Sequence, residues 1–431
     1  MADFLWQKDG ADIDARVMQF MAGDDVLLDR DIFIFDLRAS RAHAEGLRNI
    51  EVLSDKECTA LCNGLSELEE EFKQGRFVLD ERFEDGHSAI EAWLTEHLGD
   101  VGKKIHTGRS RNDQVLVATR LYLLDALGQL GALCTTSARA FLERASADPA
   151  TPMPGYTHLQ HAVVSSTGHW YAGYAEAFAD NAQLAFDTRR WISCNPLGTA
   201  AGFGVNLPLD RDHTTHALGF ERLQINPMYA QNSRGKFEIQ ALTAMAQALL
   251  DLRRTAWDLS LFCMPELGYV TLPDRFTTGS SIMPNKRNPD LIELLRASYG
   301  VVSGALTEIQ SLLALPGAYH RDLQFTKGPM LRATRHALQA LSLLPDLINT
   351  MRFDADRLRN AIEPEMFATD VALQLAANGV PFRDAYRQAL GDRAALEAIS
   401  PAQSLAARTS MGAPGNLQLE SIEKRIQALI A

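Results

Sequence analysis

Apolar residues recur at every third or fourth position over long stretches of the chain that contain no proline. Three such stretches lie between Gly155 and Asn195, between Met228 and Met264, and between Asp290 and Leu315. In the second and third, the apolar positions are Leu242, Met245, Leu249, Leu252, Ala256, Leu259 and Cys263, then Leu295, Val302, Leu306, Ile309 and Leu313. Because proline interrupts a helix and this spacing lines one helical face, the pattern predicts unusually long helices.

A further stretch, from Asn112 to about Glu143, is apolar on more than one face, as a helix buried among others would be. At 1.5 Å per residue, the predicted helices are roughly 40 to 50 Å long. Helices of that length usually bury one another across subunits, so we expect an all-α oligomeric bundle. A monomeric helical repeat is the alternative, but no motif recurs at a fixed period.

Composition and charge narrow the choice of partners. The 431 residues are 46% hydrophobic and 22% charged, which suits a large core divided among more than one unit. A net charge of -12 argues against a nucleic acid or a membrane surface, since either favours a basic face. The acidic amino terminus lacks the features of a signal peptide, so we expect a cytoplasmic location. The five cysteines show no CxxC spacing, which favours reduced thiols over disulfides or zinc.

Four polar segments, each with a glycine, break the predicted helices. They are KIHTGRSRND (104–113), MPGYTHLQ (153–160), TTGSSIMPNKRNPD (277–290) and LPGAYHRDLQFTK (315–327). Breaks between rigid elements are where functional residues concentrate. We therefore look for chemistry in these four segments.

The segment 277–290 has the residues that a serine base would need. Ser280 lacks the GxSxG context of a hydrolase nucleophile, and a serine-rich turn is the simplest interpretation. However, Lys286 and Asn288 follow closely, and Gly279 allows motion. A serine alkoxide is stabilised by cations, backbone N–H groups or a helix amino terminus, and this loop offers all three.

The other segments supply candidate binding groups. Helix capping accounts for Ser110, Asn112 and Asp113, but Arg109 and Arg111 at a helix start favour a bound carboxylate or phosphate.

In the segment 153–160, His158 suits a general acid or base beside Thr157, whose hydroxyl can hold a carboxylate. A metal pair with His161 is the weaker alternative, because no third ligand has the right spacing, and His161 is interpreted as structural. Tyr319, Gln324 and Lys327 are donors that either clamp a polar ligand or belong to a surface loop.

Several motifs in the same order resemble one family. GSSIMPNKRNP is similar to the signature of the fumarase and aspartase superfamily, and HTGRSRNDQV and MPGYTHLQ resemble its argininosuccinate lyase family in particular. The likeness extends from LWQK near Leu5 through DLRASRAHAEGL (36–47) and FEDGHSAIE (83–91) to ATDVA and GVPFRDAY (368–386). It covers nearly the whole chain.

The resemblance implies an all-α, fumarase/aspartase-like fold with a long central helix bundle flanked by two smaller helical domains. The expected boundaries are 1–108, 109–352 and 353–431. It also implies a homotetramer with active sites built from several subunits. The expected reaction is cleavage of argininosuccinate to arginine and fumarate in arginine biosynthesis, without cofactor or metal.

The resemblance also assigns roles to individual residues. Ser280 would be the base, Lys286 and Asn288 would stabilise the carboxylate beside the deprotonated carbon, and His158, paired with Glu293, would be a candidate acid. The residues expected to bind substrate are Asp29, Arg111, Asn112, Thr157, Arg234, Tyr319, Gln324 and Lys327, together with Asn288.

Some positions depart from the family pattern. Asp25 stands where a substrate-contacting Ser is usual, Gly235 replaces an Asp, and Ala39-Ser40 replaces Gly-Ser. The carboxyl-terminal region is also short for the family. The alternatives to argininosuccinate lyase are another lyase of the superfamily, such as adenylosuccinate lyase, or a non-catalytic relative of the lens crystallins.

Overall fold

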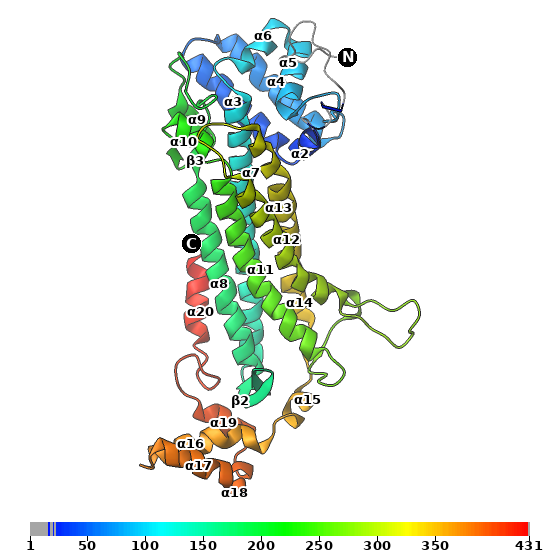
Figure 1. The fold of residues 1–431 in the computed structure, drawn as a ribbon, viewed down its shortest axis with the longest axis vertical. Helices are drawn as coiled ribbons and strands as arrows, with labels where there is room; N and C mark the ends of the chain where they lie inside the picture. Colours follow the sequence, from blue (N-terminus) through cyan, green and yellow to red (C-terminus); the bar gives the residue numbers. More distant parts are fainter. Residues whose placement is uncertain (1–15, 18–19, 21–22, 430–431) are drawn as a thin grey trace. The chain divides into compact units, whose positions relative to one another are not determined.

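The computed structural model describes residues 16–17, 20 and 23–429, and the LWQK motif lies outside them. Long helices dominate the described residues, with only short two-stranded sheets between them (Figure 1). This confirms the all-α prediction. The longest helices are α7 (Arg111–Ala147), α8 (Thr167–Ile192), α11 (Lys236–Phe262) and α12 (Asp290–Leu312), and α13 (Lys327–Ser342) follows them along the chain.

The predicted helical stretches are confirmed in α7, α8, α11 and α12. The seam of α11 is buried from Leu242 to Leu259, and α7 has 37 residues, about 55 Å. By length and composition α7 could cross a membrane, but 72% of its most apolar window is buried within the protein, as in the core helix of a soluble protein. Apolar residues on several faces of α7 therefore reflect packing among other helices.

The chain divides into two compact units, and both include residues from each of α7, α8, α11, α12 and α13. The first unit comprises the described residues up to Gln129 together with 185–244 and 302–335. Its shorter elements are α2 (Asp25–Asp29), α3 (Phe33–Asn49), α4 (Asp55–Lys73), α5 (Gly86–Leu98), α6 (Asp100–Lys103), η1 (Lys104–His106), β3 (Cys194–Asn195), α9 (Arg211–Ala217), β4 (Arg222–Leu223), α10 (Pro227–Asn232) and η3 (Arg321–Thr326). Strands β3 and β4 pair in parallel.

The core of the first unit forms where α3, α4 and α5 pack together (Figure 1). Phe33, Leu61, Leu65 and Leu94 are fully buried there. Helices α4 and α5 each begin with a capping box, in which the N-cap side chain and the third helical residue bond each other's backbone N–H. The cap of α5 is Asp85, so this local signal fixes the position of a residue that also lines the binding cavity described below.

The second unit comprises 130–184, 245–301 and the described residues from His336 onward. Its shorter elements are β1 (Pro152–Thr157), β2 (Gln160–Ser166), β5 (Val270–Thr271), η2 (Asp274–Phe276), α14 (Leu344–Thr350), β6 (Arg352–Phe353), α15 (Ala355–Asn360), η4 (Pro364–Phe367), α16 (Ala368–Ala377), α17 (Phe382–Gly391), α18 (Arg393–Glu397), α19 (Pro401–Ala407) and α20 (Leu419–Ala428). The pairs β1–β2 and β5–β6 are antiparallel. The hairpin β1–β2 lies beside α15, η4 and α19 (Figure 1).

The core of the second unit includes an anchor for this hairpin. Val164 of β2 is fully buried in a cluster with Met366, Phe367, Leu396 and Leu405.

All five cysteines are free thiols. The division into domains 1–108, 109–352 and 353–431 stays a prediction.

Candidate active site

A cavity of about 210 Å³ in the first unit gathers most of the expected substrate-binding residues. Arg111, Asn112, Arg234, Tyr319, Gln324 and Lys327 all line it. They come from the start of α7, the turn before α11, and the segment that runs from the loop after α12 through η3 to the first residue of α13. Asp25, Glu84 and Asp85 line the same cavity, so cationic and anionic groups face one another. Such a lining suits a small ligand that carries both carboxylates and cationic nitrogens.

Arg111 is held in this cavity by two acids. Its Nη1 donates to Glu84 Oε2 at 2.7 Å and lies 3.3 Å from Asp85 Oδ2. Burial alone would lower the pKa of Arg111, but Asp85 and Glu84 outweigh it and raise the pKa. Arg109 does not share this role, because it is buried away from the cavity and donates to Ser40 Oγ at 2.9 Å. The expectation that both arginines form the anion site was therefore wrong for Arg109.

The start of α7 is fixed by Asp113, which is fully buried. Its Oδ1 accepts the backbone N–H of Ser110, and its Oδ2 accepts those of Gly198 and Ala200, all at 2.9 Å. These bonds satisfy N–H groups at the helix start and at the 198–200 turn. They also place Arg111 and Asn112 at the cavity, so helix capping at this position is compatible with the expected binding role of these two residues.

Lys327 lies between two carboxylates. Its Nζ is 2.5 Å from Asp29 Oδ1 and 2.8 Å from Asp25 Oδ1. Burial would lower the pKa of Lys327, but these carboxylates raise it above its ordinary value, so the ammonium stays charged. Asp29 Oδ2 also accepts the N–H of Gly86 at 2.8 Å. Asp29 thus binds the Lys327 ammonium without lining the cavity itself. Asp25, which stands where the family usually has Ser, adds a carboxylate to the cavity wall.

Sequence reasoning missed His87, which lines the same cavity. Its Nδ1 lies 2.5 Å from Asp36 Oδ2, and Gln114 donates to Asp36 Oδ1 at 2.9 Å. Burial would lower the pKa of His87, but Asp36 raises it overall, which favours the imidazolium. The motif FEDGHSAIE contains Glu84, Asp85 and His87 and was the available signal.

The departure at Gly235 has a local explanation. Its φ is +83°, and a Cβ there would lie 2.4 Å from Leu313 Cδ2. An Asp at this position would have a strained backbone, and the Leu313 side chain would have to move to make room for it. The Gly235 N–H instead donates to Glu238 Oε2 at 2.7 Å, and neighbouring Arg234 reaches the cavity, 6.0 Å from the ring centre of Tyr319.

In the second unit, the segment 277–290 forms a loop closed at its base. Thr278 and Asn288 exchange backbone hydrogen bonds of 3.0 and 2.8 Å. Inside the loop, Ser280 Oγ accepts the N–H groups of Met283 at 3.1 Å and Ile282 at 3.3 Å. Lys286 is exposed, and the Asn288 amide donates to the Gly279 carbonyl at 3.3 Å. Two backbone N–H groups of this loop are therefore directed at the hydroxyl oxygen of Ser280.

His158 lies in the tight turn between β1 and β2, not on a helix. Thr157 pairs with Gln160, so His158 and Leu159 form the two-residue turn, and both have φ of 56°. Positive φ at both positions is the requirement of a type I′ turn, which usually selects Asn and Gly. Each non-glycine residue in this conformation costs roughly 1–2 kcal/mol. Backbone strain of this kind is concentrated at functional positions.

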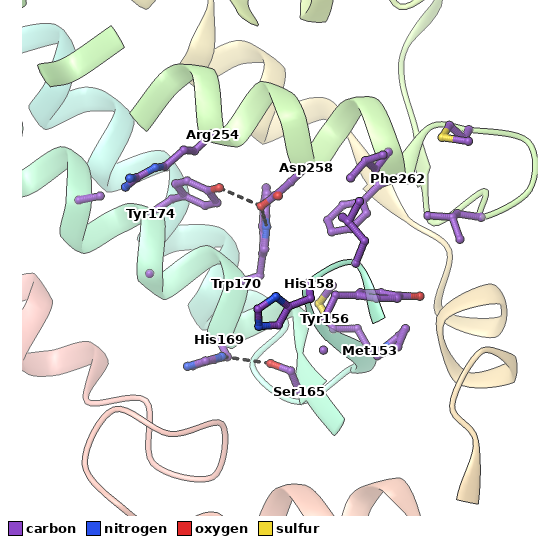
Figure 2. A pocket seen from close by; sticks show the side chains of 18 of the residues that line it. Met153, Tyr156, His158, Ser165, His169, Trp170, Tyr174, Arg254, Asp258 and Phe262 are labelled. Carbon is purple, nitrogen blue, oxygen red and sulfur yellow. Dashed lines mark hydrogen bonds between the residues drawn. The ribbon is translucent and has the colours of Figure 1, made fainter. Parts of the chain in front are cut away.

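The His158 side chain faces a cavity of about 800 Å³ in the second unit (Figure 2). Aromatic rings line much of it, and Trp170 Nε1 and Tyr174 OH both donate to Asp258 Oδ2 at 2.8 Å. Ser165 Oγ lies 3.0 Å from His169 Nδ1 (Figure 2), and burial lowers the pKa of His169. Within the described residues of this single chain, neither His158 nor Thr157 has a side-chain hydrogen bond.

Glu293, the expected partner of His158, is exposed in the first turn of α12. No hydrogen bond joins it to His158 within the described chain. The structure therefore brings most of the expected binding residues together in the first unit, whereas Thr157 and Asn288 belong to the second. The second unit also contains Ser280, which is half-buried, and His158 and Glu293, which are exposed. The His158–Glu293 pair stays a prediction.

The fold and these motifs define a member of the lyase class. The family model described as "Lyase" matches residues 14–304. In solved structures, the chain resembles an EDDS lyase in complex with formate (TM-score 0.78, 24% identity, 97% of this chain and 90% of that one). It also resembles 3-carboxy-cis,cis-muconate lactonizing enzyme from Pseudomonas putida (TM-score 0.72, 18% identity, 97% and 98%). These likenesses establish the fumarase-like fold.

Two curated relatives narrow the class. Argininosuccinate lyase of Stenotrophomonas maltophilia (strain R551-3) is 57% identical over 430 residues, and that of Xanthomonas campestris pv. campestris (strain ATCC 33913) is 56% identical, each over 100% of both chains. The chain belongs to the argininosuccinate lyase family and is a carbon–nitrogen lyase. The alignments extend over the full length of this chain and of both relatives.

Proposed function

We propose that this protein cleaves argininosuccinate into arginine and fumarate, with Ser280 as the base. The observation that supports the base most directly is the pair of backbone N–H groups that donate to Ser280 Oγ. Donors of this kind stabilise an alkoxide, which a serine must become before it can accept a proton from carbon. The charged cavity of the first unit suits the amino-acid end of the substrate.

The elimination would proceed in two steps. The Ser280 alkoxide takes the proton from the carbon beside a carboxylate, and the electron pair forms a dianionic aci-carboxylate. Lys286 and Asn288 stabilise that charge where it develops. The pair then returns to form the double bond of fumarate as the carbon–nitrogen bond breaks. The leaving guanidine nitrogen takes a proton from a general acid, for which His158 is the candidate.

The loop around Ser280 would also act as a lid. Gly279 has no atom within 4 Å of a Cβ built on it, and most residues from Ser281 to Arg287 are exposed. The closed base at Thr278 and Asn288 gives such a loop a hinge. Closure would exclude water from the aci-carboxylate and bring Ser280 to the reacting carbon.

The first test is fumarate release by the purified protein, followed by absorbance near 240 nm. We expect release from argininosuccinate, and none from adenylosuccinate, aspartate or malate supplied in parallel. Release from adenylosuccinate instead would identify the other superfamily lyase. A folded protein that releases fumarate from none of the four would indicate a recruited structural role, and Asp25 would then be the first position to restore.

We also propose a cytoplasmic homotetramer in which several subunits share each active site. In the single chain, solvent reaches Ser280, His158 and Glu293, so residues of neighbouring subunits have room to complete an active site around them. Most soluble oligomers are symmetric assemblies of identical chains, so each shared site would recur around the assembly.

Shared sites predict that two inactive variants restore each other. We expect Arg111→Ala and Ser280→Ala proteins, each purified alone, to be nearly inactive. Co-expressed in one cell, they would form mixed tetramers in which some sites contain neither change, so activity would return well above that of either variant. Sedimentation velocity of the wild type checks the tetramer. A monomeric wild type, or co-expressed variants as inactive as the separate ones, would contradict shared sites.

A further inference from the structure

Tyr156, close to the turn that contains His158, connects the hairpin to another segment of the chain. Tyr156 and His161 are cross-strand partners at the end of the hairpin, with ring centres 5.1 Å apart. The Tyr156 hydroxyl lies 2.7 Å from the hydroxyl of Tyr269 and 3.2 Å from His161 Nε2. A single phenol therefore links the hairpin to a second segment of the same unit.

Of the two groups that Tyr156 contacts, Tyr269 is the one held firmly by its surroundings. It is 2% exposed, packs against Phe262, and its carbonyl accepts the N–H of Asp354 at 2.9 Å. Burial and the Tyr269 hydrogen bond raise the pKa of Tyr156, so its phenol stays protonated and able to donate. On the other side, His161 Nδ1 lies 3.3 Å from Glu363 Oε2, in a pair that solvent reaches.

The hairpin needs such a link because its tip is poorly supported by other contacts. Residues 157–161 are exposed, and His158 and Leu159 both hold a left-handed backbone without a glycine. The strand register also shifts between Pro154 and Tyr156. Val164 anchors the base of β2, but it lies beyond this irregular part. A strained turn keeps its shape only when its surroundings determine it.

We propose that Tyr156 is a positioning residue that fixes His158 through its hydrogen bond to Tyr269. The segment of Tyr269 continues through β5 into the loop 277–290, so the hairpin with the candidate acid and the loop with the candidate base share one anchor. Tyr156 orients the His158 turn, and His161 keeps the Tyr156 phenol aligned. This inference rests on the proposed role of His158 as the acid.

The test is Tyr156→Phe, which keeps the ring and removes only the hydroxyl. We expect kcat for argininosuccinate cleavage to fall roughly 10- to 100-fold with KM nearly unchanged, because a displaced acid affects the chemical step. Amide hydrogen exchange at residues 157–160 should become faster, while the midpoint of thermal unfolding stays near that of the wild type. Tyr386→Phe, at an exposed tyrosine of α17, is the matched control and should change none of these.

Two substitutions at His161 separate its contacts. Gln can place its amide near the Nε2 position and keep the Tyr156 contact, whereas Asn reaches only the Nδ1 position and keeps the Glu363 contact. We expect His161→Gln to retain most of kcat and His161→Asn to lose it as His161→Ala does. His213→Gln is the control, because His213 forms a comparable pair with Glu45 at 2.9 Å in the first unit.

The outcomes separate this proposal from the proposed function. Faster exchange together with the fall in kcat supports positioning by Tyr156. Unchanged exchange in Tyr156→Phe overturns it, whatever the reaction. Faster exchange with unchanged kcat also overturns it, because the position of His158 would then not matter to catalysis. A wild type that does not cleave argininosuccinate, or a fully active His158→Ala, refutes the proposed function or the acid instead, and hydrogen exchange still tests the link.

Discussion

Replacing Ser280 by Ala is expected to abolish nearly all turnover while leaving the protein folded. A positioned general base contributes typically 10²–10⁴-fold to the rate, so we expect kcat to fall by roughly that factor. A thousandfold loss corresponds to about 4 kcal/mol of transition-state stabilisation. The measurement is steady-state fumarate release, with the amount of folded protein checked by thermal unfolding.

Ser281→Ala provides the matched control for this prediction. Both serines belong to the same loop, but only Ser280 Oγ accepts the N–H groups of Ile282 and Met283. Ser281 is exposed, and surface substitutions of this kind usually change stability by less than about 0.5 kcal/mol. We therefore expect Ser281→Ala to stay within a few-fold of wild-type turnover. A Ser280→Ala protein as active as Ser281→Ala would mean that another group removes the proton.

The long helices could be predicted because their signals are local. The seam from Leu242 to Leu259 repeats within one helix, and proline-free stretches mark where a helix can run. The break at 277–290 was predictable for the same reason, since glycine and proline there punctuate the pattern. These elements were predictable because they depend on the spacing of residues along the chain, which can be read directly from the sequence.

The conformation of the His158 turn could not be predicted, because its sequence lacks the usual signal. A two-residue hairpin turn normally contains Asn-Gly or Asp-Gly, and here it is His158-Leu159. The turn forms because of contacts distant in sequence, such as the one between Tyr156 and Tyr269. Such tertiary contacts override local preference and do not appear in periodicity.

The candidate binding cavity was predictable only in part, for a similar reason. Arg109 and Arg111 look equivalent in the sequence, yet the start of α7 turns one toward Ser40 and the other into the cavity. The partners of Lys327 lie 298 positions away at Asp29 and further still at Asp25. Resemblance suggested that Asp29 and Lys327 both bind substrate, but only the fold brings them into one ion cluster.

Replacing Lys327 by Met is expected to cause the largest loss of stability. The Lys327 side chain is 3% exposed, and its ammonium compensates Asp29, whose side chain is 2% exposed. Removing one partner of a buried pair leaves an uncompensated charge and costs about 3–5 kcal/mol. The measurement is urea denaturation at fixed protein concentration. Arg335→Met is the control, because the pair of Arg335 with Asp31 is exposed and such pairs contribute about 0–1 kcal/mol.

The origin of this loss can be checked in two ways. Adding Asp29→Asn to Lys327→Met removes the more buried of the two carboxylates left without the ammonium and should recover part of the lost stability. The pH dependence has a definite sign, because the carboxylates raise the pKa of Lys327 above 10.5, the ordinary value for a lysine. The stabilisation is therefore fully present below about pH 10.5 and is lost as pH rises through the folded-state pKa. The difference in unfolding free energy between wild type and Lys327→Met should therefore not narrow from pH 7 to 9 and should narrow only at higher pH. A difference that narrows between pH 7 and 9 would contradict a raised pKa of Lys327.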